Sequence, residues 1–237
     1  MPAKRVLVVY NYDNTGLGQV GAALAEAGAE VEIIRAHHGE ALPATAENHD
    51  AAVVLGGGQN ALADDEYPYI PALLELLRDF EGHDKAVLGI CLGSQIIARA
   101  FGGKNQIGGA TEFGWCEVAL TEGAAGDPVL GALPQRFPIF QWHDDTFALP
   151  PGAAHLATNG TARNQAFRIG RAAYGIQFHF EADLPLVTEW SQGEAFADAL
   201  AERQPDWAGR FETEAARHAP AADAAGLAIA RAWVATI

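Results

Sequence analysis

The sequence has 237 residues, of which 49% are hydrophobic and 19% are charged, and its formal net charge is −15. This composition excludes a disordered chain, and the length is sufficient for one α/β domain with a sizeable core. The strong negative charge argues against binding to nucleic acid or to anionic membrane surfaces, because their phosphates would repel the protein.

Apolar runs and cysteine usage bear on the cellular compartment. The apolar run near the N-terminus is too short for a secretory signal, and no run reaches the ~18 residues that a membrane-spanning helix needs. The two cysteines, Cys91 and Cys116, could form one disulfide but not a disulfide framework. We therefore expect a cytoplasmic protein with reduced thiols and no membrane contact.

The first half of the chain alternates apolar runs with helical patterns. Strands are expected at residues 5–10, 30–34, 51–55 and 86–89. Helices are expected at residues 17–27, 68–80 and 94–100. Residues 5–10 form a continuous apolar run rich in β-branched residues, as in a strand that is buried on both faces, and residues 51–55 read as another buried strand. Strands and helices that alternate in this way predict a mostly parallel, three-layer α/β sheet.

The second half is rich in short strands, which are expected at residues 115–120, 137–142, 155–158, 165–169 and 173–180. These strands should pack onto the first sheet or extend it, and Asn159-Gly160 is expected to form a tight turn. From residue 186 onward the composition is helical, with breaks expected at Pro205 and Pro220. We therefore predict one globular domain over residues 1–185 and a helical C-terminal extension, residues 186–237, packed on the same domain.

Residues 87–95 read VLGICLGSQ and contain the pattern Gly-x-Cys-x-Gly. This is the cysteine version of the nucleophile elbow, in which a strand enters a helix through a turn too tight for side chains at positions ±2. Cys91 would then lie at a helix N-terminus, where the helix dipole and free N–H groups favour a thiolate. The alternative is a buried structural cysteine between two loop glycines, and the rest of the chain bears on the choice.

A cysteine nucleophile needs a base that takes its proton and returns it to the leaving group. His179 and Glu181 are two residues apart, so on a strand both side chains point to the same side. There, or across a local bend, the carboxylate can orient the imidazole and stabilise its protonated form. Taken alone, the pair could be two partly exposed strand residues; after a cysteine elbow it indicates a catalytic base. His143, which precedes two aspartates, is a rival base.

A tetrahedral intermediate would need preorganised N–H donors for its oxyanion. One natural donor is the N–H of Leu92, directly after the cysteine. The other is the glycine loop of residues 56–58, because backbone without side chains can approach a substrate closely. The alternatives for this loop are a phosphate cradle, although no Lys or Ser/Thr follows in P-loop register, and a simple strand-to-loop turn.

A metal cluster can be imagined from three histidine-containing segments: His37-His38, His143-Asp144-Asp145 and the pair His179 and Glu181. None of them has the i, i+4 spacing or the cysteine pairing of a typical zinc site, so no metal and no cofactor are expected. Cys116 lies between Trp115 and Glu117 with no basic partner nearby in sequence. It is expected to be a buried apolar residue.

Residues 5–183 resemble the class I (triad-type) glutamine amidotransferases, because the glycine loop, Gly-Ile-Cys-Leu-Gly-Ser-Gln, Trp-His-Asp-Asp and Gln-Phe-His-Phe-Glu follow in the order of that family. The resemblance implies a flavodoxin-like fold. It also implies a reaction in which the cysteine attacks the side-chain amide of glutamine, ammonia leaves, and a glutamyl thioester is hydrolysed to glutamate. The roles carried over are Cys91 as nucleophile, His179 as general base and acid, Glu181 as orienting carboxylate, Gly58 and Leu92 as oxyanion donors, and Gln95, His143, Asp144 and Asp145 around the amino-acid end of the substrate.

Two positions depart from the family pattern. Phe180 stands between the matching His and Glu, where the family usually has Pro, and Asp144 stands where it usually has Gly. Asp tolerates left-handed backbone better than most residues, so we expect the turn to survive. No departure falls on Cys91, His179 or Glu181.

The residues after Glu181 are helical in composition and too few for a domain that would consume ammonia. The chain therefore resembles the stand-alone branch, with similarity to the glutaminase domain of GMP synthase and to γ-glutamyl peptidases, and a separate synthase subunit is a candidate ammonia acceptor. The substrate would be glutamine or a γ-glutamyl small molecule. Two other interpretations are a chaperone-like or protease-like member of the superfamily, which usually has His at the position of Leu92, and a non-catalytic partner that keeps the fold.

Overall fold

The alternating half of the chain folds as expected. The computed structural model describes residues 2–237. Its first four strands are β1 (Arg5–Tyr10), β2 (Glu30–Arg35), β3 (Ala51–Val54) and β4 (Ala86–Ile90). The helical elements between and after them are α1 (Gly18–Glu26), the 3₁₀ turn η1 (Ala36–His38), α2 (Tyr69–Gly82) and α3 (Leu92–Ala100). Helix α3 begins at residue 92 rather than 94, so Cys91 directly precedes it.

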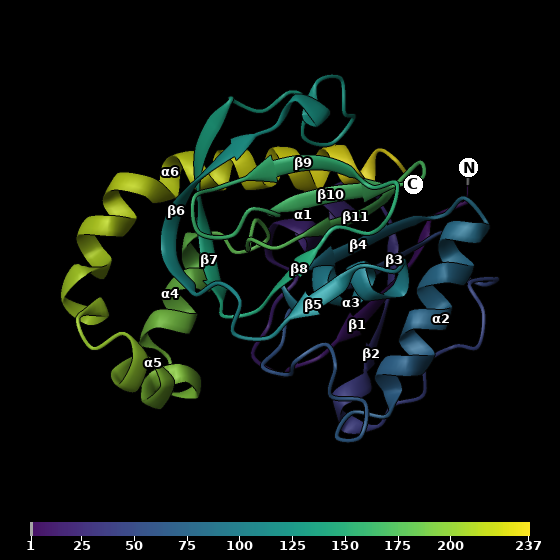
Figure 1. The fold of residues 1–237 in the computed structure, drawn as a ribbon, viewed down its shortest axis with the longest axis horizontal. Coiled ribbons are helices and arrows are strands. Elements are labelled where there is room, and N and C mark those ends of the chain that lie inside the picture. Colours follow the sequence, from purple (N-terminus) through teal and green to yellow (C-terminus); the bar gives the residue numbers. More distant parts are fainter. Residues whose placement is uncertain (1) are drawn as a thin grey trace.

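A single nine-stranded sheet runs through the molecule in the order β2-β1-β3-β4-β11-β10-β9-β6-β7 (Figure 1). The strands β2, β1, β3, β4 and β11 are parallel neighbours, and the order of these five is that of flavodoxin-like folds. In such sheets ligands bind beyond the carboxyl ends of the strands. The predicted flavodoxin-like α/β fold is confirmed. Cys91 directly follows the carboxyl end of β4, on the side of the sheet where such folds bind ligands.

The remaining strands extend this sheet by antiparallel pairing. They are β6 (Glu112–Leu120), β7 (Arg136–His143), β9 (Ala154–Thr158) and β10 (Ala166–Ile169), with the short turn η2 (Glu122–Ala124) after β6. They join the parallel part through β11 (Ala173–Ile176), which pairs with β10. A small separate sheet, which the sequence did not predict, pairs β5 (Lys104–Gln106) with β8 (Thr146–Ala148).

The last predicted strand, residues 173–180, is too long. Strand β11 ends at Ile176, and the chain then leaves the β4 neighbour and crosses toward β7. The Gln177 N–H donates to the Gln165 carbonyl at 2.8 Å, and the His179 N–H donates to the Phe140 carbonyl at 2.8 Å. These two bonds replace the β ladder and hold residues 177–181 as a bent bridge between β11 and α4.

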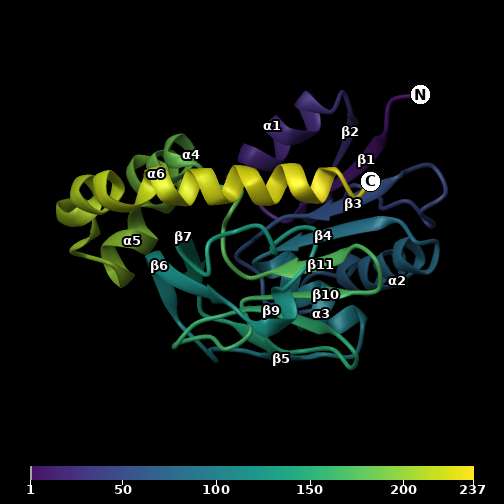
Figure 2. The ribbon, with the colours of Figure 1, turned by 90° about the horizontal axis from the view of Figure 1, so that it is seen from above.

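Helices cover both faces of the sheet, which gives the predicted three layers. Figure 2 shows α1 and α6 on one side of the strands and α2 and α3 on the other. One core joins the first face to Val20 and Leu24 of α1 and Ile229 and Trp233 of α6. The second core contains Leu73 and Leu77 of α2 and Ile96 and Ile97 of α3. Strands β1, β3 and β4 are buried on both faces along most of their length, as expected for residues 5–10 and 51–55, whereas the edge strand β2 is largely exposed.

The C-terminal part forms α4 (Leu184–Gln192), the short turn η3 (Glu194–Phe196), α5 (Ala197–Arg203) and α6 (Trp207–Val234). The helix break at Pro205 is confirmed, but the break at Pro220 is wrong: α6 continues through this proline. An interior proline costs roughly 3 kcal/mol. Burying side chains such as Ile229 and Trp233 contributes about 1.5–3 kcal/mol each and offsets that cost.

Among residues 2–237, no helix has the length and apolar character needed to cross a membrane.

Candidate active site

Cys91 lies on a strained turn between β4 and α3, with φ +53° and ψ −111°. Its neighbours at ±2 have no room for a side chain. A Cβ on Gly89 would lie 2.4 Å from the Gly93 carbonyl oxygen, and a Cβ on Gly93 would lie 2.0 Å from that of Val54. A non-glycine residue at positive φ costs about 1–3 kcal/mol and is common at functional sites. The steric reason for the Gly-x-Cys-x-Gly pattern is therefore as predicted.

His179 faces Cys91 from the bridge after β11. Its Nδ1 is 2.7 Å from Oε1 of Glu181, and the opposite edge of the ring is turned to the Cys91 thiol. Both side chains of the His179–Glu181 pair are buried. The two residues lie on a local bend, since β11 ends before them, so their convergence does not come from strand alternation. The backbone bond from His179 to Phe140 of β7 sets the position of the ring.

The charged form of His179 is stabilised by its surroundings. Burial lowers the pKa of His179, but the Glu181 carboxylate and the Cys91 side chain outweigh it and hold the pKa well above its usual value. The ring also packs edge-on against Trp190, with 5.1 Å between centroids. Trp190 is anchored in turn, because its Nε1 donates to the Asn14 carbonyl at 2.9 Å.

The glycine loop passes directly beside Cys91 and His179. A Cβ on Gly56 would lie 3.3 Å from Cε1 of His179 and 3.5 Å from Cβ of Cys91, so this position borders both side chains. A Cβ on Gly57 would lie 2.8 Å from Cβ of Asn11, whose Nδ2 donates to the Leu55 carbonyl and thereby ties the start of the glycine loop to the end of β1. Gly58 has open space where a side chain would be and lines the pocket.

Gln95 and Asp145 meet on one side of the pocket. The Gln95 Nε2 donates to the Asp145 carbonyl and to Oε1 of Gln177, both at 3.2 Å. The Asp145 carboxylate accepts from the Gly108 N–H at 2.7 Å. This arrangement holds the segment after β7 against helix α3, as expected if the two elements share one bound molecule.

The ring of His143 is engaged on both nitrogens. Nδ1 lies 2.9 Å from the Asp145 carbonyl oxygen, and Nε2 lies 3.2 Å from Oε2 of Glu112. Glu112 is itself buried and accepts from Gln165 and Asn159. A ring held in this way supports the segment around Asp144 and is not free to act as the rival base. The role of Glu112 was missed from the sequence, because it lies 31 residues before His143.

Asp144 forms an ion pair with Arg203 at the end of α5. Burial raises the pKa of Asp144, but the hydrogen bonds from Arg203 and Thr111 outweigh it and lower the pKa. Cys91 and Asp84 are the non-glycine residues of positive φ among those described, so Asp144 does not adopt left-handed backbone. The Asp that replaces the family's usual Gly is therefore accommodated without strain.

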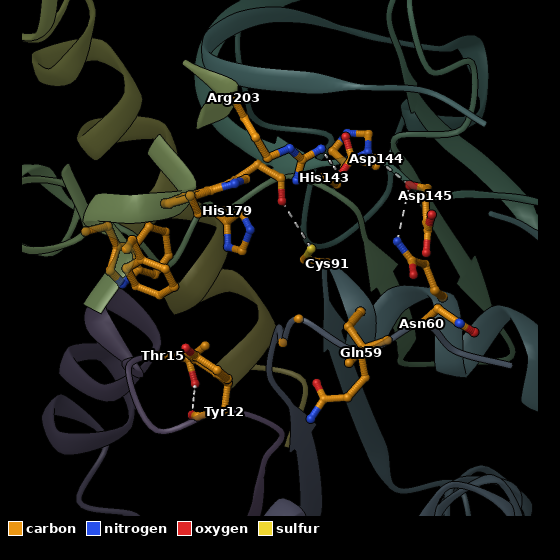
Figure 3. A pocket seen from close by; sticks show the side chains of 18 residues that line it. Tyr12, Thr15, Gln59, Asn60, Cys91, His143, Asp144, Asp145, His179 and Arg203 are labelled. Atoms are coloured by element: carbon orange, nitrogen blue, oxygen red, sulfur yellow. Dashed lines mark hydrogen bonds and ion pairs between the residues drawn. The ribbon is translucent and has the colours of Figure 1, made fainter. Parts of the chain in front are cut away.

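A cavity of about 430 Å³ joins these residues (Figure 3). Seven of the predicted site residues line it together with His179, and Glu181 stands behind that ring. The lining residues that the sequence did not indicate are Tyr12, Thr15, Gln59, Asn60, Trp190, Phe196, Ala199 and Arg203. They come mainly from the loop after β1 and from the C-terminal helices, and only the chain fold brings them to Cys91.

The start of α1 carries a glycine pattern that the sequence interpretation overlooked. Residues 16–21 read GLGQVG, the glycine spacing of dinucleotide-binding loops. Here the glycines serve an internal contact: a Cβ on Gly18 would lie 2.0 Å from the Glu181 carbonyl oxygen, and the Gln19 N–H donates to that oxygen at 2.8 Å. This helix N-terminus therefore holds the backbone of Glu181 rather than a phosphate.

The other cysteine is separate from the pocket. Cys116 is a free, partly buried thiol, and Cys91 is also free. Burial, with the nearby Glu112 and Glu214, raises the pKa of Cys116 to about 11. The expectation of a buried apolar residue is met only in part, because the Cys116 side chain is half-buried.

The strand order and the turn at Cys91 place the protein among α/β proteins with a nucleophile elbow. The model of one family, described as glutamine amidotransferase class-I, matches residues 8–186. The glutamine amidotransferase-like protein YfeJ of Salmonella typhimurium is 33% identical over 175 residues, which are 71% of this chain and 73% of that protein. The chain therefore belongs to the class-I glutamine amidotransferase family.

Other relatives show where the similarity ends. A glutamine-hydrolyzing GMP synthase subunit of Pyrococcus abyssi is 33% identical over 109 residues, covering 45% of this chain and 56% of that protein. The match to GMP synthase of Thermosipho melanesiensis covers 73% of this chain but only 33% of the relative.

Solved structures match over the whole chain. A glutamine amidotransferase of Thermotoga maritima superposes with TM-score 0.86 at 28% identity, covering 99% of this chain and 97% of that chain. One from Methylobacillus flagellatus gives TM-score 0.81 at 26% identity, covering 100% and 96%. Because these matches extend past residue 186, the C-terminal helices are part of the shared architecture.

Proposed function

We propose that the protein is a cysteine amidase that hydrolyses the γ-amide of glutamine to glutamate and ammonia. The observation that carries the proposal is the position of Cys91, on a strained turn at the start of α3, beside a His179 ring that is held by Glu181. A nucleophile, a base and an orienting carboxylate in this order are the parts that acyl transfer through a thioester requires.

In the first half of the reaction, the Cys91 sulfur attacks the amide carbon of the substrate. The negative charge that develops on the oxygen is stabilised by the N–H groups of Leu92 and Gly58. Leu92 is the first residue of α3, where backbone N–H groups lack intrahelical partners. His179 then protonates the amide nitrogen, the C–N bond breaks, and ammonia leaves a glutamyl thioester on the enzyme.

In the second half, His179 removes a proton from water, and the hydroxide attacks the thioester carbon. The C–S bond breaks, glutamate leaves, and the proton returns to the sulfur. Gln95 and the segment of His143, Asp144 and Asp145 would bind the amino-acid end of the substrate. Asp145, which accepts from Gln95, lies on the other side of Cys91 from His179 (Figure 3). Glu181 would keep the imidazole in the required orientation through its 2.7 Å contact with Nδ1.

The test is glutamate release by the wild type and by Cys91→Ala, together with labelling by a glutamine-mimicking electrophile. We expect the substitution to lower the rate by at least about 10⁴-fold, as for other nucleophile deletions, and the label to be found on Cys91. Equal glutamate release by the two proteins would refute the proposal.

The lining of the pocket favours a second candidate, a γ-glutamyl hydrolase whose leaving group is an amine larger than ammonia. His179 must reach the leaving nitrogen, so the leaving group lies on its side of the cavity. That side is lined by Tyr12, Trp142, Trp190 and Phe196. Ammonia makes no use of an aromatic wall, whereas burying an apolar or aromatic substituent against it contributes affinity.

A panel of γ-glutamyl amides separates the two candidates. We expect Phe196→Ala to lower kcat/KM for an aromatic γ-glutamyl amide by roughly 10-fold, which corresponds to loss of one aromatic contact, and to leave glutamine hydrolysis unchanged. An equal effect on both substrates would argue against a leaving-group wall. Weak turnover of every substrate by the wild type would indicate a separate synthase subunit that activates the site and consumes the ammonia.

A further inference from the structure

Three side chains converge just outside the pocket: Asp13 from the loop after β1, and His37 and His38 from η1. Nε2 of His37 is 3.0 Å from Oδ1 of Asp13, and Nε2 of His38 is 2.8 Å from the same oxygen. The three ligating atoms all lie within 4.8 Å of one another. Only the two histidines are adjacent in sequence, and Asp13 lies 24 residues before His37. The chain fold therefore brings the three side chains together.

The parallel pairing of β1 and β2 brings these residues together. Tyr10 at the end of β1 lies opposite Arg35 at the end of β2. The chain after each strand therefore emerges at the same edge of the sheet. Gly39, at φ +81°, ends η1 after a single turn, and its N–H donates to the Ala36 carbonyl at 2.9 Å. This turn holds both imidazoles over the end of β1.

The hydrogen-bond partners of His37 define which ring nitrogen carries a hydrogen. Nδ1 lies 3.0 Å from the Tyr10 carbonyl oxygen, which can only accept, so Nδ1 is the donor. In the neutral ring, Nε2 then presents a lone pair to the Asp13 carboxylate, which is also an acceptor. Two acceptors this close need a proton or a metal ion between them. A histidine whose other nitrogen donates to a backbone carbonyl is the usual arrangement of a metal ligand.

We propose that Asp13, His37 and His38 bind a divalent transition-metal ion, with Zn²⁺ as the best match. Two imidazoles and one carboxylate suit Zn²⁺, which takes such ligands at about 2.0–2.2 Å and completes a tetrahedron with water or another ligand. The His37 side chain is only 10% exposed, and its contact with the Tyr10 carbonyl already fixes the orientation of the ring. The side chains of His38 and Asp13 are 53% and 56% exposed. The two exposed side chains can close onto the ion without moving the backbone.

The site would act on the pocket through the loop that carries Asp13. This pocket loop, residues 11–17, also contributes Tyr12 and Thr15 to the cavity lining. A metal bridge from Asp13 to η1 would tie the pocket loop to the end of β2 and restrict its motion. The inference does not depend on the proposed reaction, since it concerns binding of the metal alone.

The test is titration of the full chain with Zn²⁺ by calorimetry, and with Co²⁺ by its visible absorption. Both are done in the Cys91→Ala background, so that the pocket thiol and His179 do not provide a competing site. We expect one ion per chain and slower amide hydrogen exchange in residues 11–17 when the metal is present. Asp13→Asn and His38→Ala, each at an exposed ligand, should weaken binding by at least about 100-fold.

His83→Ala is the matched control, because His83 is an exposed histidine that contacts a single carboxylate, Asp79 at 3.3 Å. It should bind Zn²⁺ like the parent. The proposal is overturned if the parent binds no metal, or if Asp13→Asn and His38→Ala bind it as tightly as His83→Ala does. Unchanged thermal midpoints without metal will show that the ligand variants are folded.

Discussion

Substituting Gly226 by Ala tests whether helix α6 positions His179, the proposed catalytic base. Gly226 packs against the backbone of Phe180, the residue between His179 and Glu181. A Cβ at this position would lie 2.2 Å from the Phe180 carbonyl oxygen and 3.2 Å from its carbonyl carbon. The two Phe180 atoms belong to backbone and cannot rotate away, whereas Nε2 of Gln19, 2.5 Å from the same Cβ, belongs to a flexible side chain that can.

Restoring an ordinary contact requires α6 or residues 177–181 to move by about 1 Å. A displacement of this size at a reacting group costs about 100-fold in rate. We therefore expect Gly226→Ala to lower kcat for glutamine hydrolysis about 100-fold and to change KM much less, because Gln95 and Asp145 lie on the other side of Cys91. Overpacking should cost about 1–3 kcal/mol of unfolding free energy, partly offset by the better helix propensity of Ala.

Gly209→Ala provides the matched control in the same helix, because a Cβ at this position meets no atom within 4 Å. It should leave kcat unchanged and stabilise the protein by up to about 1 kcal/mol. The assay is steady-state glutamate release, supported by the rate at which a glutamine-mimicking electrophile labels Cys91. A folded Gly226→Ala protein with the wild-type kcat would show that α6 does not set the position of His179.

Three further predictions follow from charge and packing. Because the pKa of Cys116 is raised to about 11, only about 0.1% of it is thiolate at pH 8, and a thiol reagent should modify Cys91 first; modification of Cys116 at an equal rate would contradict this. Because the folded-state pKa of His179 is raised, through Glu181 above all, its charged form stabilises the fold fully below the unfolded pKa of about 6.5, and this contribution is lost as the pH rises through the folded pKa. His179→Gln should therefore destabilise the protein more at pH 6 than at pH 9 in urea unfolding, and a pH-independent difference would speak against the charged pair. Pro220 is an exposed proline inside α6, so Pro220→Ala should restore one helical hydrogen bond and raise the unfolding free energy by about 1–3 kcal/mol, measured in the same way; no gain would indicate that the helix is adapted to the proline.

Local patterns in the sequence determined the core of the fold and the centre of the site. A strand that helices cover on both faces is a continuous apolar run in the sequence, so the parallel strands and the helices α1 to α3 could be predicted. The elbow was predictable because its steric demand is local: the glycines at positions 89 and 93 must lack a Cβ for the chain to turn there. The two-residue spacing of His179 and Glu181 after the elbow indicated a base with its carboxylate, and the resemblance of the later motifs to a known family supported that interpretation.

Tertiary structure decided the features that depend on contacts between distant segments. Strand β11 ends at residue 176 because the next backbone groups bond to Gln165 and Phe140, which no periodicity in residues 173–180 records. Helix α6 continues through Pro220 because buried residues on both sides pack against the sheet. The aromatic wall of the pocket and the meeting of Asp13 with His37 and His38 arise in the same way. Each of these features needs two chain segments that lie at one edge of the sheet, and the pairing between strands sets that placement. The sequence alone determines only which side chains each segment brings to that edge.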